Sequence, residues 1–183
     1  MNEDYFMKRK VKLFIAMSVD GYIAKDEDNI DFLSIVERPG EDYGYADFKQ
    51  SVDTLIWGRK TYDKVRTLGG NEFLHTDKKV YVLSRTRTGK EEHVEFYNAP
   101  VKTLIASLQN EPGKDIYCDG GAEVIFELLK DSLIDEMIIS VIPHLVGHGI
   151  RLFKDGAPEQ ALAFKRSITY PSGLVQLWYS KQV

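Results

Sequence analysis

Two short apolar segments of the chain end in glycine and continue directly into patterns typical of helices. The first turn of a helix carries unpaired amides and a partial positive charge, and glycine there lets a phosphate approach the backbone closely. Either turn alone is more simply explained as a tight connection, whereas two such turns side by side can clamp one pyrophosphate. The residues at the two turns are Gly58, Arg59, Lys60 and Thr61, and Gly120, Gly121 and Ala122.

A third apolar, strand-like segment ends in the polar sequence Ser84-Arg85-Thr86-Arg87. Hydroxyl and guanidinium groups suit a phosphate monoester, which is the group that distinguishes NADP from NAD. The simpler alternative is a solvated basic turn. If the three segments are strands of one open sheet, their polar ends meet at its carboxyl edge, where such folds bind ligands.

Other chemistries are poorly supported by the sequence. The glycine patterns of the Rossmann site and of the P-loop are absent, and so is the G-x-S-x-G pattern of many hydrolases. His144 and His148 have the spacing of helical metal ligands, but Pro143 and Gly147 argue against a helix, so we expect no metal site. Cys118 lies in an apolar segment, where its thiol pKa is raised, and we expect it to be inert.

The elements that position these residues follow from apolar patterning and from the turn residues between segments. We predict an α/β fold with an eight-stranded mixed sheet, mostly parallel, with an antiparallel C-terminal hairpin around Pro171-Ser172-Gly173. The predicted strands are 11–19, 54–57, 80–83, 94–97, 115–118, 137–142, 161–170 and 174–179. The predicted helices are a short one over 46–52, one over 59–68, one that opens at Pro100 and one after Gly121.

Length and composition limit the possible classes of protein. A chain of 183 residues is expected to form one domain, here 1–183 with its core at about 10–181, and 43% apolar with 28% charged residues excludes a disordered chain. The net charge of −4 argues against a nucleic-acid partner or an anionic membrane surface. No apolar run reaches spanning length, the N-terminal residues are acidic, and there is a single cysteine, so we expect a cytoplasmic protein.

Several short motifs, in this order and spacing, resemble the dihydrofolate reductase superfamily. They are Ile15 to Ala24 (IAMSVDGYIA), Leu55 to Tyr62 (LIWGRKTY), Val82 to Arg85 (VLSR) and Asp119 to Ala122 (DGGA). The tail, Ile134-Asp135-Glu136 with Ile142 to Phe153 (IPHLVGHGIRLF), resembles more closely the C-terminal reductase domain of bacterial riboflavin-biosynthesis proteins of the RibD type. The similarity covers nearly the whole chain after Lys10.

The resemblance implies a three-layer α/β/α fold of the dihydrofolate reductase type, with NADPH bound along the carboxyl edge of the sheet. By position, Ala16 and Ile23 would flank the nicotinamide, while Ser84 and Arg85 would hold the 2′-phosphate. The phosphate-binding residues implied in the same way are Gly58, Arg59, Lys60 and Thr61, with Gly120, Gly121, Ala122 and Glu123 under the pyrophosphate.

Two further features are implied by the family. The bond between Gly120 and Gly121 is expected to be a cis peptide. Related reductases also suggest a homodimer formed through the C-terminal strands, although Trp178 and Tyr179 would serve an intramolecular core equally well.

Reduction by hydride also needs a proton donor or hydrogen-bonding group near the acceptor. Asp20 and Asp119 are the candidates, and each has a simpler role, in a turn and as a helix cap respectively. Riboflavin-type reductases carry an acid at the place of Asp119. Dihydrofolate reductases use an acid one turn ahead of an aromatic residue, but counting back from Phe48 gives Gly44, with Asp47 as a shifted alternative.

The sequence therefore predicts an NADPH-dependent reductase that transfers hydride to a small heterocyclic or sugar-linked substrate. The family-implied substrate is 5-amino-6-(5-phosphoribosylamino)uracil. A folate reductase and a non-catalytic NADPH-binding module remain alternatives. The aromatic residues that could stack on a planar heterocycle, or else belong to the core, are Tyr43, Tyr45, Phe48 and Trp57.

Overall fold

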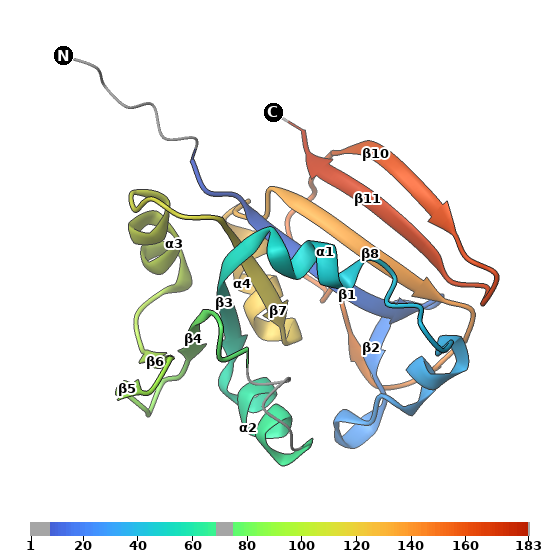
Figure 1. The fold of residues 1–183 in the computed structure, drawn as a ribbon, viewed down its shortest axis with the longest axis horizontal. Coiled ribbons are helices and arrows are strands. Elements are labelled where there is room, and N and C mark those ends of the chain that lie inside the picture. Colours follow the sequence, from blue (N-terminus) through green and yellow to red (C-terminus); the bar gives the residue numbers. More distant parts are fainter. Residues whose placement is uncertain (1–7, 69–74, 183) are drawn as a thin grey trace.

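The computed structural model describes residues 8–68 and 75–182, and within them the chain forms a twisted nine-stranded sheet with helices on both faces (Figure 1). Pairing is parallel from β8 through β1, β7, β3 and β4 to β6, and antiparallel at both edges. In spatial order the strands are β10 (Leu162–Thr169), β11 (Val175–Lys181), β8 (Glu136–Ile142), β1 (Val11–Ser18), β7 (Asp115–Gly120), β3 (Val52–Gly58), β4 (Lys79–Leu83), β6 (Val94–Tyr97) and β5 (Gly89–Glu91).

The mixed sheet with its antiparallel C-terminal hairpin is confirmed, and all eight predicted strands are present. The prediction of eight strands was one too few for this sheet, because β5 pairs with β6 at the far edge. All three residues of β5 are exposed and none is apolar, so the strand carries no alternation to detect. A separate two-stranded sheet, β2 (Tyr22–Ala24) with β9 (Ile150–Arg151), was not predicted either.

Four α-helices of the described chain cover the two faces of the sheet, and two 3-10 helices occupy the acidic segment after β2. Their bounds are α1 (Tyr45–Gln50), α2 (Arg59–Leu68), α3 (Val101–Gln109), α4 (Ala122–Lys130), η1 (Asp26–Asp28) and η2 (Asp31–Val36). Residues of α1 and α2 share one apolar cluster with the sheet, and residues of α3 and α4 share another. This is the predicted three-layer arrangement.

Alternation along β7 decides which side chains face which layer. Ile116 and Cys118 belong to the cluster with α3 and α4, whereas Tyr117 belongs to the cluster with α1 and α2. Since successive side chains of a strand point to opposite faces, Asp119 follows Tyr117 onto the α1 side. Cys118 is completely buried, and burial raises its thiol pKa to about 12, which agrees with an inert core cysteine.

Arg9 ties together the amino ends of the central strands, at the edge opposite the glycine turns. Its side chain is buried, donates to Thr54 Oγ1 at 2.6 Å and forms an ion pair with Asp53. It also donates to the carbonyl oxygen of Lys114 at 2.5 Å. One guanidinium therefore joins β3 to the segment that leads into β7.

We expect Arg9→Ala to lower the free energy of unfolding by roughly 2–4 kcal/mol, because Asp53 and buried acceptors lose a charged donor. Urea denaturation measures the change. The neighbouring Lys8→Ala, at an exposed position, is the control and should stay within about 0.5 kcal/mol of the parent. Equal effects of the two substitutions would show that the Arg9 contacts do not stabilise the fold.

Candidate active site

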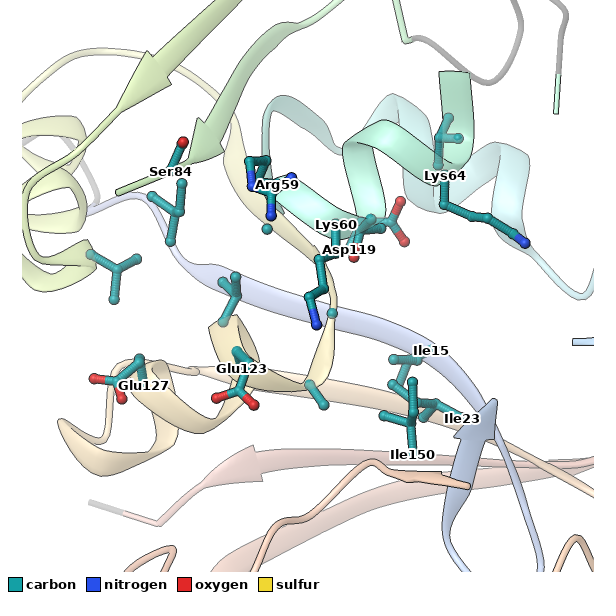
Figure 2. A pocket seen from close by; sticks show the side chains of 18 of the residues that line it. Ile15, Ile23, Arg59, Lys60, Lys64, Ser84, Asp119, Glu123, Glu127 and Ile150 are labelled. Carbon is teal, nitrogen blue, oxygen red and sulfur yellow. The ribbon is translucent and has the colours of Figure 1, made fainter. Parts of the chain in front are cut away.

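A large cleft runs along the carboxyl edge of the parallel strands (Figure 2), with a volume of about 1670 Å³. It reaches from Ser84 at the end of β4 to the apolar corner formed by Ile15, Ile23 and Ile150. Drug-sized ligands typically occupy pockets of about 300–1000 Å³, so this cleft has room for a dinucleotide and a second small molecule.

The two glycine turns lie against one another inside this cleft. A Cβ atom built on Gly58 would lie 3.2 Å from Val124 Cγ2 and 3.7 Å from the Gly121 amide nitrogen. A Cβ on Gly121 would lie 3.0 Å from Thr61 Oγ1. The starts of α2 and α4 therefore approach closely because neither turn carries a side chain, and their free amides open onto one space.

The predicted cis peptide between Gly120 and Gly121 is present. Gly120 has a φ of +97°, a backbone conformation that residues with a side chain rarely adopt. Gly121 lines the cleft, whereas Gly120, which is predicted to bind the coenzyme as well, is not part of the lining.

Unpaired cations line the cleft. Lys60 points from the first turn of α2 toward α4, and Lys64 lies one turn further on, on the side away from Ser84 (Figure 2). Among the described residues neither lysine side chain has an ion pair or a hydrogen bond, and the same is true of the Arg85 side chain. Arg59 lines the cleft as well, but its guanidinium is held by Asp63 at 2.8 Å.

The acidic residues on the opposite wall are mostly paired with their own lysines. Glu123 forms an ion pair with Lys154, and Glu127 lies 3.4 Å from Lys130. These pairs reduce the negative field of α4, so the free lysines of α2 face little opposing charge. An anion entering between the two helices meets backbone amides and positive charge.

The turn after β4 is built around the hydroxyl of Ser84. Its oxygen accepts from the backbone amide of Arg87 at 2.9 Å and from that of Thr86 at 3.3 Å. A hydroxyl has one hydrogen besides its acceptor lone pairs, so Ser84 remains able to donate to a ligand. Arg87 itself is tied to Asp63 at 3.0 Å, which leaves Arg85 as the free guanidinium of the turn.

Asp119 is the predicted catalytic acid that lines the cleft. Its Oδ2 accepts from Trp57 Nε1 at 2.8 Å, and its Oδ1 accepts from the hydroxyl of Tyr117. Burial raises the pKa of this carboxyl from 3.8 to about 6, and the two hydrogen bonds oppose that rise. A carboxyl with such a pKa holds a proton in a useful fraction of molecules near neutral pH.

Asp20 lies outside the cleft lining and is engaged by the chain itself. Its carboxylate accepts from Ser18 Oγ, from the Gly147 amide at 2.7 Å and from the Val146 amide at 3.1 Å. The hydrogen bond from Ser18 is the main reason that its pKa falls to about 2. Asp20 thus fastens the segment after β8 to the end of β1, a role that differs from the turn role considered from the sequence, and its predicted catalytic role remains a prediction.

The aromatic candidates divide between core and cleft. Phe48 and Trp57 are buried, and Tyr43 packs edge-on against Tyr170. Only Tyr45 of these candidates lines the cleft. On the same helix Asp47 is exposed and outside the lining, so the structure gives no support to a shifted folate-type acid there.

Most of the predicted ligand-binding residues therefore meet in one cleft. Ala16 and Ile23 line its apolar corner, and the lining also includes Gly58, Arg59, Lys60, Thr61, Ser84, Arg85, Gly121, Ala122 and Glu123. Sequence reasoning missed the wall at the end of β6, Tyr97 to Lys102, which the rule about carboxyl ends could have found. It also missed Lys64, which helical spacing places one turn beyond Lys60.

No cluster of metal ligands occurs among the described residues, and His148 instead lies 2.9 Å from Asp26. None of the described helices is long and apolar enough to cross a membrane.

The fold is that of the dihydrofolate reductase-like proteins. The structure of a dihydrofolate reductase from Enterococcus faecalis, complexed with NADP(H) and RAB-propyl, superposes with a TM-score of 0.62 at 16% identity, covering 95% of this chain and 97% of that one. Within this class the RibD C-terminal domain family model matches residues 9–176, and the chain belongs to that family.

Two other proteins have a higher sequence identity to this chain. The uncharacterized protein YwjB of Bacillus subtilis (strain 168) is 42% identical over 174 residues, which cover 94% of this chain and 98% of YwjB. The crystal structure of a putative riboflavin biosynthesis protein from Shewanella sp. PV-4 has a TM-score of 0.87 at 32% identity, covering 95% of this chain and 99% of that one.

The raised pKa of Asp119 predicts a pH-dependent cost of folding. Between about pH 4 and pH 6 the folded chain holds a proton that the unfolded chain has lost, so stability falls as the pH rises through this range. Asp119→Asn removes this dependence. We expect its stability relative to the parent to increase by up to about 3 kcal/mol between pH 4 and pH 7, measured by urea denaturation at each pH.

Asp20→Asn is the matched control with the opposite sign. Because the folded-state pKa of Asp20 is lowered to about 2, its charge stabilises the fold above about pH 4, and that contribution is lost as the pH falls toward 2. The asparagine variant should therefore lose stability relative to the parent as the pH rises through that lower range. The same pH dependence in both variants would contradict the assignment of the two carboxyls.

Proposed function

We propose that this protein is an NADPH-dependent reductase that transfers hydride to a small heterocyclic or sugar-linked substrate, with Asp119 as the proton donor. The observation that carries the proposal is the position of Asp119, a carboxyl with a pKa of about 6 that opens into a cleft large enough for two ligands. The membership of the RibD C-terminal domain family supports a reductase.

The residues of the cleft fit the dinucleotide in three places. The paired glycine turns, Gly58 and Gly121, leave a cradle that a side chain would fill, which suits the pyrophosphate. Ser84 and the free guanidinium of Arg85 suit the 2′-phosphate. Ala16 and Ile23, at the apolar corner, suit the nicotinamide, which supplies the hydride when the coenzyme is bound.

The substrate would occupy the part of the cleft near Asp119. Phe14 and Tyr45 line the cleft, pack on each other and contact Tyr117 beside Asp119, and their rings suit a flat heterocycle. Lys64, which lies on the side away from Ser84, offers a positive charge to an anionic substituent such as a sugar phosphate. These features favour a substrate resembling 5-amino-6-(5-phosphoribosylamino)uracil. The similarity to the Shewanella protein, described as a putative riboflavin biosynthesis protein, supports this proposal.

The reaction is tested by following NADPH oxidation with this pyrimidine and with dihydrofolate in separate reactions. We expect turnover of the pyrimidine or a close analogue and none of dihydrofolate, because Gly44 stands where folate reductases place an acid. Turnover of dihydrofolate alone would reverse the assignment. Tight NADPH binding without oxidation by any flat heterocycle tested would leave a binding module in place of a reductase.

Arg85→Ala tests the choice of coenzyme. Loss of the guanidinium should weaken NADPH binding by about 10- to 100-fold and leave NADH binding within about twofold, because only NADPH carries the 2′-phosphate. Calorimetric titration with both coenzymes measures the two dissociation constants. Arg87→Ala, whose guanidinium is tied to Asp63, is the matched control. An equal loss for NADPH and NADH would exclude a specific contact between Arg85 and the 2′-phosphate.

Asp119→Asn tests the proton donor. We expect kcat to fall by about 10²–10⁴-fold, since the amide keeps the shape of the side chain but has no acidic proton to give. Binding of NADPH should be unchanged, which calorimetry checks. A variant with normal turnover would show that the proton comes from another group.

We also propose that the chain forms a homodimer through its C-terminal edge. Phe164 of β10 is 61% exposed and Leu162 is 37% exposed, on the outermost strand of the sheet. Trp178 and Tyr179 are partly buried against the two core clusters, so they contribute to the core of the subunit. Sedimentation of the parent and of Phe164→Glu tests the dimer, which the added charge should dissociate; a parent that sediments as a monomer would contradict it.

A further inference from the structure

The hydroxyl of Tyr117 stands between two acceptors. One is Oδ1 of Asp119, and the other is the backbone carbonyl oxygen of Phe14, 3.1 Å away. A tyrosine hydroxyl has a single hydrogen, so it can satisfy only one of the two acceptors at a time. Phe14 directly follows Leu13, where the pairing of β1 with β7 ends.

The other oxygen of Asp119, Oδ2, has a partner that can only donate a hydrogen bond. Trp57 Nε1 donates to Oδ2 at 2.8 Å, and an indole nitrogen can only donate. A proton on Oδ2 would oppose this bond, so the neutral carboxyl carries its proton on Oδ1, the oxygen beside Tyr117. The indole therefore determines which oxygen of the acid is protonated.

We propose that Tyr117 is a positioning residue whose hydroxyl hydrogen moves between Asp119 and the Phe14 carbonyl, so that the acid is hydrogen bonded in both of its protonation states. When Asp119 is charged, Tyr117 donates to Oδ1. When Asp119 is neutral, its Oδ1 proton is directed to the oxygen of Tyr117, and Tyr117 donates to the carbonyl. The Asp119 carboxyl and the Tyr117 hydroxyl therefore each keep a hydrogen-bond partner in either state, while the Phe14 carbonyl receives the Tyr117 hydrogen only when the acid is neutral.

This arrangement deepens the proposed reductase, and its use in catalysis rests on that function. The Oδ1 proton first turns from Tyr117 toward the cleft, which Asp119 lines. The O–H bond at Oδ1 then breaks as the proton passes to the substrate atom that becomes basic on hydride addition, and the bonding pair stays on Oδ1. The Tyr117 hydrogen then turns from the carbonyl to the new carboxylate. The acid is thus stabilised after it gives up its proton without admitting water.

The other ionisable groups nearby do not compete for this proton. Burial and the neighbouring Asp119 charge raise the pKa values of Tyr45 and Tyr117 above 10, so both hydroxyls stay protonated. His75, which packs on Trp57, has its pKa lowered to about 4 by burial and is neutral near pH 6. The remaining ionisable groups that line the cleft around Asp119, or adjoin it in sequence, are Cys118 of β7, Lys60 and Lys64 of α2, and Glu123 of α4.

The test is an NMR titration of the protein without any substrate, so it does not depend on the reductase assay. The probes are the carboxyl carbon of Asp119, identified by its absence in Asp119→Asn, and the hydroxyl proton of Tyr117, identified by its absence in Tyr117→Phe. We expect the hydroxyl resonance to change position with the same midpoint as the carboxyl. Its low-pH position should match that in Asp119→Asn, where the amide group donates to Tyr117 as the neutral acid does. A hydroxyl resonance that does not follow the titration would overturn the proposal.

Tyr117→Phe provides the second measurement. Without the hydroxyl the carboxylate loses a charge-assisted hydrogen bond and the neutral acid loses a weaker one, so the midpoint of Asp119 should rise by about one pH unit. If this variant is unstable, the comparison between the parent and Asp119→Asn decides alone. An unchanged or lower midpoint in a folded Tyr117→Phe would refute the role of Tyr117. If the Tyr117 hydroxyl and the Asp119 carboxyl titrate together in a protein that reduces no substrate, the result would support the hydrogen-bond switch and contradict the proposed reductase activity.

Discussion

The hydrogen bond from Trp57 to Asp119 joins the carboxyl ends of β3 and β7, and the arrangement of the cleft depends on it. Each of these strands leads within one or two residues into a glycine turn and then a helix. Because the indole is buried in the core between the sheet and α2, its hydrogen bond fixes the position of the Asp119 carboxyl group. The acid, the glycine turns and the starts of α2 and α4 are therefore positioned together rather than separately.

The charge of the protein explains how an acidic chain can offer an anion site. With a net charge of −4, long-range attraction of phosphates is not available, so any attraction has to be local. Asp63 engages Arg59 and Arg87, while Glu123 and Lys154 engage each other. Among the described residues of the cleft, Lys60, Lys64 and Arg85 have no ion pair, and Lys60 lies in the first turn of α2 near its amides. Such a site selects a ligand by the positions of its phosphates more than by its total charge.

Much of the fold and part of the site could be predicted from the sequence, and the difference has a physical reason. Buried parallel strands such as β3 and β4 each contain a continuous apolar run, 55–57 and 80–83, and a glycine marks the end of β3, so strand and turn signals agree. The exposed β5 has neither signal. Its pairing depends on the position of β6, which no local pattern encodes.

The two acids show the same limit at the level of single residues. Asp20 and Asp119 both follow a buried strand and precede a glycine, so composition and spacing cannot separate them. Their tertiary contacts distinguish them. Asp20 accepts hydrogen bonds from two backbone amides of a segment more than 120 residues away, whereas Asp119 accepts them from side chains of the core. Tyr117 escaped notice because an aromatic residue in an apolar strand is the ordinary pattern of a core position.

The environment of Asp119 also shows how a stable fold can retain a functional acid. Burial makes its charged form costly, and two donors offset only part of that cost, which is why its pKa stays near 6 instead of returning to 3.8. A third donor would stabilise the folded chain further and, by lowering the pKa, remove the proton at neutral pH. The proposed chemistry therefore requires that the hydrogen bonds offset only part of the cost of burying the charge. The surrounding apolar core contributes the stability that the buried carboxyl does not.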